Sequence, residues 1–459
     1  RTAQDISPMD GKTLRFYCCG PTVYGPAHIG NFRTFVMQDI FRRVLELGGT
    51  PTMHVRNLTD VDDKTIRDSQ KAGVSLAEFT AGWADLFHRD CTALNCLPPH
   101  VEPSAVGHIP EQIRMVQALV EKGHAYVSED GSVYFRISSF PEYGKLSHLD
   151  ERDLGKTANA RSNADEYEKD SVADFVLWKS RRPEDGDNFW PSPWGEGRPG
   201  WHLECSAMIH KYFGNDFDLH SGGVDLVFPH HENEIAQSEA ATGKPFARYW
   251  MHNGYINVDN QKMSKSLGNF RLVRDIAQEF DLEAVRLFLL SAQYRNPINF
   301  TRELIEQANT ALTRIRTARE RLPEAKEGPA TAEDESFIAS LAEHEKRFCD
   351  AMDDDLNTAD ALGAMFDYAR AVNTFVTEPR SREALDRAAK LFDDMTNVLG
   401  ILQHSKSEEF PKEAVALLNE RAEARKAKNW ARADQIREEL KAMGFAVEDS
   451  KEGAKLKRL

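Results

Sequence analysis

The sequence has no long apolar stretch, few cysteines and no excess of positive charge. No segment reaches the roughly 20 apolar residues that a membrane helix needs, and no signal-peptide pattern opens the chain. Its six cysteines include no Cys-x-x-Cys pair, which argues against a disulfide framework and against a closed four-sulfur zinc site. A formal net charge of −15 argues against indiscriminate nucleic-acid binding. We therefore expect a cytoplasmic protein without membrane association.

The first informative motif is His28-Ile29-Gly30-Asn31, which lies where an apolar strand-like run at residues 14–19 gives way to a helical pattern. A helix N-terminus attracts phosphate through its unpaired N–H groups and its dipole. Gly30 allows close approach of a nucleotide, and His28 and Asn31 add hydrogen-bond donors. On its own, His28 in such a string is more often a surface turn residue.

The second motif is Lys262-Met263-Ser264-Lys265-Ser266, about 230 residues further along the chain. Two lysines and two serines on a mobile loop can hold a triphosphate and neutralise the charge that develops as pyrophosphate leaves. On its own, such a string is more often an ordinary solvated lysine loop.

As a pair, the two motifs resemble those of the class I aminoacyl-tRNA synthetases in order, placement and residue type. The resemblance implies an adenylate-forming site for ATP with Mg²⁺, in which His28, Asn31, Lys262 and Lys265 are catalytic and Gly30, Ser264 and Ser266 bind the nucleotide. One departure is Asn31, where the family pattern most often has His. Asn keeps a donor but cannot carry a positive charge.

A metal site is predicted by the residue types of Cys19, Cys205, His230 and Glu234, because thiolate, imidazole and carboxylate are all zinc ligands. His230 and Glu234 are four residues apart and share one face of a helix. Spacing alone leaves His231 as an alternative to His230, and Cys18 as an alternative to Cys19.

Four longer strings are similar to the cysteinyl-tRNA synthetases: CGPTVY at residues 19–24, RNLTDVDDK at 56–64, GWHLECSAM at 200–208 and FPHHENE at 228–234. The resemblance implies one Zn²⁺ per chain on Cys19, Cys205, His230 and Glu234. It also implies that Gly222 and Gly223 lie by the adenosine. We expect Trp201 to wall the amino-acid pocket and Thr59 to contact the substrate backbone, although Trp201 could equally pack in a core.

The order of expected elements predicts an α/β fold: a Rossmann-like parallel-sheet catalytic domain with an inserted domain, then an α-helical bundle and a small C-terminal module. A hairpin is expected at residues 125–137, closed by Asp130-Gly131. The expected parts are the catalytic domain at 1–107 and 191–258, a connective insertion at 108–190, the lysine-loop region at 259–300, the bundle at 301–400 and the C-terminal module at 401–459.

The C-terminal module contains a helical pattern over residues 421–443, in which Trp430 lies among basic residues. Trp430 could stack on an unpaired base or fill the core of a small domain. The resemblance implies that this module reads the anticodon of tRNA(Cys).

The resemblance thus implies a ligase that activates L-cysteine with ATP and transfers it to tRNA(Cys). We expect this ligase to be a monomer. Two alternatives remain at this point. One is an amide ligase of the mycothiol-ligase type, which uses the same adenylate, although such relatives lack the C-terminal module. The other is a non-catalytic paralogue that binds tRNA or zinc.

Overall fold

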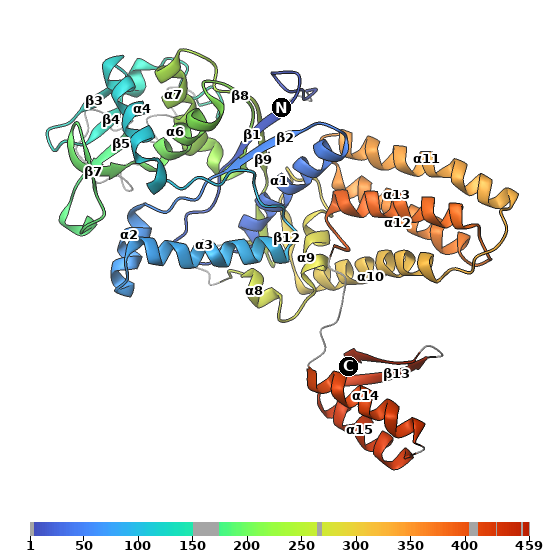
Figure 1. Cartoon of the computed structure of the whole chain (residues 1–459). Helices are drawn as coiled ribbons and strands as arrows, with labels where there is room; N and C mark the ends of the chain where they lie inside the picture. The colour runs from blue at the N-terminus through green and yellow to red at the C-terminus, as the bar shows by residue number, and fades with distance from the viewer. Residues whose placement is uncertain are drawn as a thin grey trace. The chain divides into compact units, whose positions relative to one another are not determined.

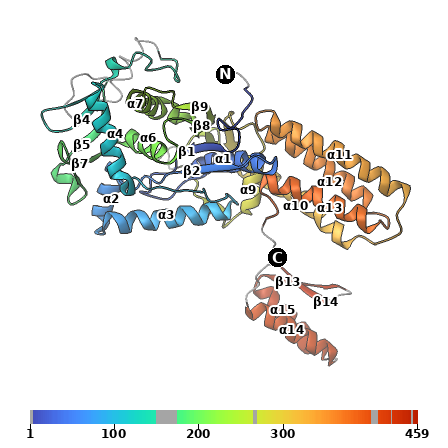
Figure 2. The ribbon, with the colours of Figure 1, turned by 45° about the horizontal axis from the view of Figure 1, so that its top comes forward.

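The computed structural model describes residues 4–149, 174–263, 269–403, 412–427, 429–450 and 453–458. The chain divides into two compact units, Arg1–Gln403 and His404–Leu459. Their ribbons are drawn in Figures 1 and 2.

A parallel sheet flanked by helices lies at the centre of the first unit; its elements are β1 (Leu14–Cys18), α1 (Ile29–Leu47), β2 (Thr52–Arg56), α6 (Trp201–Phe213), β8 (Phe217–Gly223), α7 (Glu232–Thr242) and β9 (Ala247–Asn253). The strand order is β2-β1-β8-β9, and all neighbours pair in parallel. Phe16 of β1 packs in the core cluster that contains α1, whereas Tyr17 packs in the cluster that contains α6 and α7. Because successive strand residues point to opposite faces, helices cover both sides of the sheet. This confirms the Rossmann-like α/β fold expected from the sequence.

Part of the chain between β2 and α6 in sequence forms an antiparallel sheet and a helix. The helix is α4 (Ile109–Glu121), and the strands are β3 (Ala125–Val127), β4 (Val133–Phe135), β5 (Phe175–Ser180), β6 (Trp190–Ser192) and β7 (Gly195–Pro199). The strand order is β3-β4-β5-β7-β6. The expected hairpin is confirmed, since Val127 pairs with Val133 across the turn. Gly131 has a φ of 86°, a left-handed conformation that glycine adopts without a steric cost. Figure 1 shows this sheet and α4 beside α6 and α7.

Two helices, α2 (Asp63–Ala72) and α3 (Leu76–Ala93), connect β2 to the segment that leads into α4. After β9 come the short elements β10 (Ile256–Val258), β11 (Gln261–Lys262), α8 (Val273–Ile276), α9 (Leu282–Leu289) and β12 (Ile298–Phe300). β10 pairs with β11 as a hairpin and with β12 in parallel. Lys262, the first residue of the lysine string, belongs to this small sheet.

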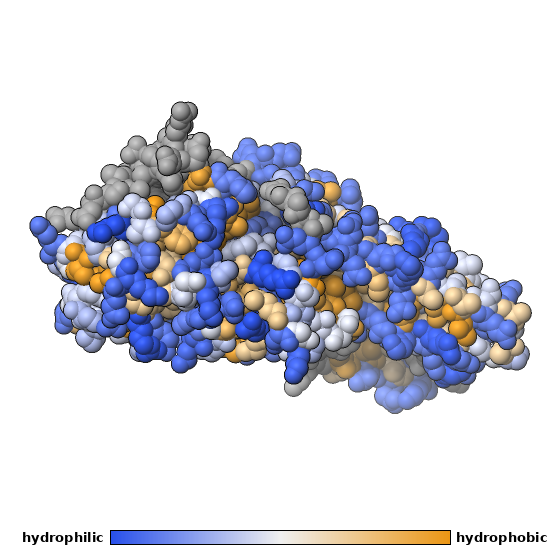
Figure 3. Space-filling view, turned by 90° about the horizontal axis from the view of Figure 1, so that it is seen from above, coloured by the Kyte–Doolittle hydropathy of each residue, from blue (hydrophilic) through white to orange (hydrophobic). Residues whose placement is uncertain are grey.

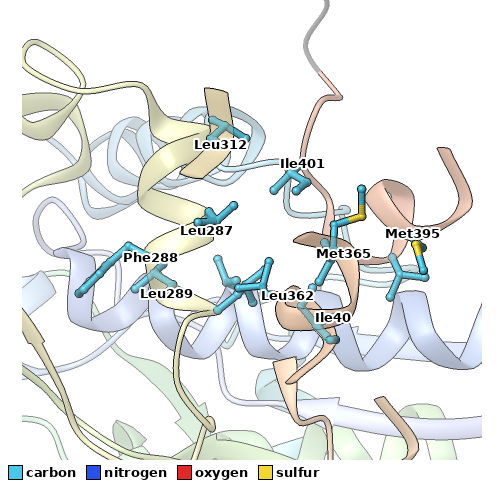
Figure 4. Close-up of a cluster of buried hydrophobic side chains, with 14 of the residues drawn as sticks. Ile40, Leu287, Phe288, Leu289, Leu312, Leu362, Met365, Met395 and Ile401 are labelled. Carbon is cyan, nitrogen blue, oxygen red and sulfur yellow. The ribbon is translucent and has the colours of Figure 1, made fainter. Parts of the chain in front are cut away.

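Four long helices complete the first unit: α10 (Arg302–Glu324), α11 (Ala332–Asp353), α12 (Thr358–Phe375) and α13 (Arg382–Leu399). Their core is continuous with that of α1 and α9, and Figure 4 shows Ile40 of α1 near side chains of the bundle. The fully buried Arg286 of α9 bonds Asp39 of α1 and the carbonyl oxygen of Leu399 at the end of α13. The bundle is therefore anchored to the helix that begins at the first motif.

The acidic run Asp353-Asp354-Asp355 lies where two helices of the bundle meet. Asp353 is the last residue of α11, and Asn357 is the N-cap of α12. Asp355 accepts a hydrogen bond from the Tyr294 hydroxyl, 2.8 Å away. Asp355 therefore links the bundle to the segment before β12.

The second unit contains α14 (Lys412–Lys426), α15 (Trp430–Ala442), β13 (Phe445–Ser450) and β14 (Gly453–Arg458). The helical pattern expected over residues 421–443 is confirmed for most of its length but is divided between two helices, because α14 ends at Lys426 and Asn429 caps α15 by accepting the Arg432 N–H. The basic residues Lys455, Lys457 and Arg458 lie in β14, which pairs with β13. Trp430 is 58% exposed and lies outside the small core of Ala414, Ile436, Leu440 and Phe445.

Among the helices of the described ranges, none combines the length and the apolar character needed to cross a bilayer. On the face drawn in Figure 3, hydrophobic residues lie in small groups among hydrophilic ones. Trp201 and Trp430 are two large hydrophobic side chains that are exposed.

Candidate active site and metal centre

The first motif forms the start of α1. His28 is the N-cap; its Nδ1 accepts the Asn31 N–H at 3.3 Å, and the Asn31 Oδ1 accepts the His28 N–H at 3.0 Å. A Cβ at residue 30 would lie 2.9 Å from His28 Nδ1, so Gly30 leaves the room that the His28 ring occupies. Asn31 thus uses its carbonyl oxygen for the cap, which leaves its N–H₂ group as the end that can donate elsewhere.

Residues of the second motif and just beyond it contact the first motif. The Ile29 N–H donates to the carbonyl oxygen of Arg271 at 2.9 Å, and the His28 ring lies 4.9 Å from the Phe270 ring. Within the second motif, the Cε of Met263 would lie 3.9 Å from a Cβ on residue 30. Lys262 lies in β11 opposite Asn257, while Ser264, Lys265 and Ser266 lie outside the described residues. The fold therefore brings the two ends of the lysine loop to the N-terminus of α1.

The expected metal ligands meet beside the end of β1. One ligand atom from each of Cys19, Cys205, His230 and Glu234 lies within 4.8 Å of the others, and all four residues are buried. His230 Nε2 is 3.1 Å from Glu234 Oε1. Two thiols, an imidazole and a carboxylate at this separation can hold a metal ion.

The structure separates Cys18 from the ligand group but places His231 close to it. Cys18 is the last residue of β1 and packs in the cluster that contains α1, on the face away from Cys205. His231 lies near the ligand group, because Cys19, His220, His231 and Glu234 form a second set of donors within 4.8 Å. The Nδ1 of His231 is held 2.8 Å from His252 Nε2.

The pKa values of these buried side chains shift in different directions. Hydrogen bonding with Cys19 lowers the pKa of the Cys205 thiol to about 6 in spite of its burial. Burial opposes charge on His230, but Glu234 and Cys205 together raise its pKa above the usual value. Burial lowers the pKa of His231 well below its usual value. The group is therefore suited to hold one thiolate next to a cationic partner.

Further histidines contact the predicted ligands, and the motifs in the sequence do not predict these contacts. His220 Nε2 is 2.9 Å from Glu234 Oε2, and His202 Nδ1 is 2.9 Å from His230 Nδ1. No sequence spacing links these residues. One signal in the sequence is that His252 lies next to the carboxyl end of a parallel strand, where α/β sheets bind their ligands, whereas His220 lies in the middle of its strand.

The remaining predicted residues lie around this cluster. Trp201 begins α6, is 42% exposed and has its ring 4.4 Å from the His230 ring, so it lines an open surface and not a core. The Thr59 hydroxyl donates to Glu204 Oε2 at 2.9 Å. Gly222 and Gly223 end β8, and a Cβ at Gly222 would lie 2.9 Å from the His231 ring.

Three family models match the chain. Residues 5–310 match the tRNA synthetases class I (C) catalytic domain, residues 347–403 match the DALR domain, and residues 407–455 match the cysteinyl-tRNA ligase anticodon binding domain. The chain is 46% identical to the cysteine–tRNA ligase of Symbiobacterium thermophilum over 463 residues, which covers 100% of this chain and 98% of the relative. It is 47% identical to that of Opitutus terrae, with 99% and 97% covered.

Among solved structures, the fold is similar to methionyl-tRNA synthetase of Mycobacterium tuberculosis in complex with methionyl-adenylate. The TM-score is 0.59 at 16% identity, and the match covers 84% of this chain and 89% of the other. At this identity the likeness concerns the fold, which is that of a class I synthetase. With its sequence strings, its parallel sheet and all three family matches in agreement, the chain belongs to the cysteine–tRNA ligase family of class I aminoacyl-tRNA synthetases.

Proposed function

We propose that this protein is a cysteine–tRNA ligase that forms cysteinyl adenylate and then charges tRNA(Cys). In the first step a carboxylate oxygen of L-cysteine attacks the α-phosphorus of ATP and pyrophosphate leaves. In the second step a terminal ribose hydroxyl of the tRNA attacks the carbonyl carbon and AMP leaves. The observation that carries the proposal is the buried group of Cys19, Cys205, His230 and Glu234 at the carboxyl end of the parallel sheet, in a chain that matches cysteine–tRNA ligases over its whole length.

Cys19, Cys205, His230 and Glu234 would hold one Zn²⁺ per chain. The donor set fits this metal, because zinc accepts thiolate, imidazole and carboxylate ligands and the donor atoms already lie within 4.8 Å of one another. When bound, the metal supplies a Lewis acid that favours the deprotonated form of a substrate thiol. Trp201, next to His230, would wall the pocket around that side chain.

For the ATP part of the reaction, His28, Asn31, Lys262 and Lys265 would stabilise the charge on the phosphates, with Mg²⁺ bound to ATP. The N-terminus of α1 supports this assignment, since its N–H groups and dipole favour an anion. Gly30, Ser264 and Ser266 would bind the nucleotide, and Gly222 and Gly223 would lie by the adenosine. Catalysis in this proposal comes from positioning and charge stabilisation, without a protein nucleophile.

The tRNA would be held by the helical bundle at 301–400 and by the C-terminal module at 401–459, whose match to an anticodon binding domain supports this role. The boundaries at residues 107, 190, 258 and 300, which divide the catalytic domain, the insertion, the lysine-loop region and the bundle, stay predictions. We further propose that the enzyme acts in the cytoplasm as a monomer.

Two assays on zinc-loaded protein test the proposal. Cysteine-dependent exchange between ATP and pyrophosphate reports the first step, and acylation of purified tRNA(Cys) reports the second. The proposal expects both activities with cysteine and neither with serine. Exchange without acylation would favour an amide ligase. If neither exchange nor acylation is observed, the result would favour a non-catalytic paralogue that binds tRNA or zinc.

A further inference from the structure

One buried arginine on α1 holds two separate segments of backbone. The Nη1 of Arg33 donates to the carbonyl oxygen of Tyr255 at 2.7 Å. Its Nη2 donates to the carbonyl oxygens of Gln293, at 3.4 Å, and of Asn296. Tyr255 precedes β10, whereas Gln293 and Asn296 precede β12. A single guanidinium therefore joins α1 to the backbone that leads into both parallel strands of the small sheet formed by β10, β11 and β12.

The direction of these hydrogen bonds is fixed, because a guanidinium only donates and a carbonyl oxygen only accepts. Arg33 is 2% exposed, and no carboxylate among the described residues forms an ion pair with it. Burial lowers the pKa of Arg33 to about 10, so the side chain is still charged at neutral pH. A neutral side chain would avoid the cost of burying a charge. What Arg33 adds is a fork of N–H donors that holds several carbonyl oxygens at once.

The two segments that Arg33 holds are also bonded to each other. The Gly254 N–H donates to the carbonyl oxygen of Tyr294 at 2.8 Å, and the Ile298 N–H donates to that of Tyr255 at 3.0 Å. A Cβ on residue 254 would lie only 2.7 Å from the carbonyl oxygen of Arg295, so glycine permits this close approach. The guanidinium therefore attaches to one connected piece of backbone at the base of the small sheet.

The small sheet sets where the lysine loop begins. Asn257 of β10 pairs with Lys262 of β11 across the turn Asp259-Asn260. Both turn residues have a positive φ, 49° and 63°, as two-residue hairpin turns of this kind require. The turn fixes the register of the hairpin. The backbone position of Lys262 therefore follows from that of the segment beginning at Tyr255.

Both ends of the lysine loop are thus attached to the first turns of α1. Beyond the loop, the carbonyl oxygen of Arg271 accepts the Ile29 N–H at 2.9 Å. Before the loop, the backbone at Tyr255 is held by Arg33. Ile29 and Arg33 are four residues apart, and residues at this spacing share one face of a helix. Helical side chains also lean towards the N-terminus, which brings the two attachments close together.

We infer that Arg33 is a positioning residue for the proposed adenylation reaction, and that its guanidinium holds the small sheet, and with it the lysine loop, at the N-terminus of α1. The inference rests on the proposed function and deepens it, because it names the residue that places the two parts of the ATP site next to each other. Arg33 acts through the backbone and not on the substrate. A misplacement of about 1 Å can cost roughly 100-fold in rate.

Two substitutions separate the donor fork from the charge. Arg33→Lys keeps the positive charge but presents a single ammonium group in place of the fork, and Arg33→Met removes both. We expect kcat for cysteine-dependent exchange between ATP and pyrophosphate to fall roughly 10- to 100-fold in both variants. KM for cysteine should stay unchanged, because none of the contacts of Arg33 involves the metal group.

Arg43→Lys is the matched control. Arg43 lies on the same helix and also donates to two backbone carbonyl oxygens, those of Asn95 at 2.8 Å and Asn397 at 2.9 Å. Neither of these carbonyl groups belongs to the small sheet or to the lysine loop. Arg33→Lys and Arg43→Lys should therefore lose similar amounts of stability in thermal unfolding, while exchange should fall only in Arg33→Lys.

Limited digestion with trypsin gives a readout that does not depend on turnover. Trypsin cleaves after lysine, and the lysine loop offers Lys262 and Lys265. Mass spectrometry follows the rate of cleavage at these two residues well below the unfolding temperature. We expect roughly 10-fold faster cleavage in Arg33→Lys and Arg33→Met than in the wild-type protein or Arg43→Lys, because the hydrogen bonds that hold the base of the hairpin are lost.

The outcomes distinguish the inference from the proposed function. Arg33→Lys with the wild-type kcat and the wild-type cleavage rate overturns the inference, as does an equal loss of exchange in Arg43→Lys. A loss in Arg33→Met alone would assign the effect to charge and also overturns it. If Arg33→Met does not fold, Arg33→Lys decides the matter. Wild-type protein without exchange overturns the proposed function, and the cleavage rates then still decide whether Arg33 holds the loop.

Discussion

The N–H of Ile29 donates a hydrogen bond to the carbonyl oxygen of Arg271 over 2.9 Å. Ile29 belongs to the first motif, and Arg271 lies just beyond the second. The contact ties the start of α1 to the far flank of the lysine loop, although the two residues are more than 200 positions apart. The helix N-terminus and the two lysines can bind the same triphosphate only if the fold places the lysine loop next to the start of α1.

Asn31→Asp tests whether the amide of Asn31 donates to phosphate. The Asp carboxylate can still accept the His28 N–H, so the cap survives, but the donor is lost and a negative charge is added. We expect the rate of cysteine-dependent exchange to fall roughly 100- to 1,000-fold. Thermal unfolding should change little.

Asn31→Ala is the matched variant, because it also removes the Asn31 side-chain oxygen that accepts the His28 N–H in the cap. Here we expect the free energy of unfolding to fall by about 1 kcal/mol in addition to the loss of rate. Exchange by Asn31→Asp at the wild-type rate would show that Asn31 is only a cap.

Metal content distinguishes the two adjacent cysteines. Cys205→Ser should abolish stoichiometric zinc, because it removes a thiolate from a group of four ligands. Cys18→Ala should keep one zinc per chain, since Cys18 packs on the opposite face of β1. Elemental analysis of purified variants measures both, and zinc loss from Cys18→Ala would contradict the assigned ligand set.

Trp430 provides a test of the C-terminal module. Its exposure of 58% leaves the ring free to stack on a base, which is worth enough that Trp430→Ala should lower kcat/KM for tRNA roughly 10- to 100-fold. Cysteine-dependent exchange should not change, because it needs no tRNA. Met443→Ala, which removes another exposed hydrophobic side chain of the same unit, is the control.

Asp90 gives a prediction about pH. Burial raises the pKa of this carboxyl to about 6, so the folded state binds its proton more tightly than the unfolded state does. Wild-type stability should therefore decline as pH rises from about 4 to about 6 through this group. Asp90→Asn removes the decline, and we expect the variant to be more stable by about 1 kcal/mol at pH 7.5 and no more stable at pH 4. Chemical denaturation at the two pH values measures the difference; an equal gain at both would contradict the assignment.

Much of the fold follows from local sequence. The strand of β1, the amphipathic α1 and the Asp130-Gly131 turn are all encoded by neighbouring residues, and they form as expected. The break at Asn429 was missed because helical spacing continues across it, while its capping bond to the Arg432 N–H is a short-range feature that any Asn could form.

The site was only partly predictable for a different reason. Cys19 and Cys205 lie in separate strings, and only the fold shows that hydrogen bonds connect their neighbours Gly20 and Glu204 through Asn57 and Thr59. Hydrogen-bond direction depends on tertiary contacts of this kind, which no periodicity in the sequence reveals.

The most direct test of the account is the ratio of kcat/KM for cysteine to that for serine in ATP–pyrophosphate exchange on zinc-loaded protein. A site built around one specific polar contact rejects the analogue that lacks it, so the account predicts a ratio of roughly 10⁴ or more. A ratio near one, or exchange with neither amino acid, would contradict it.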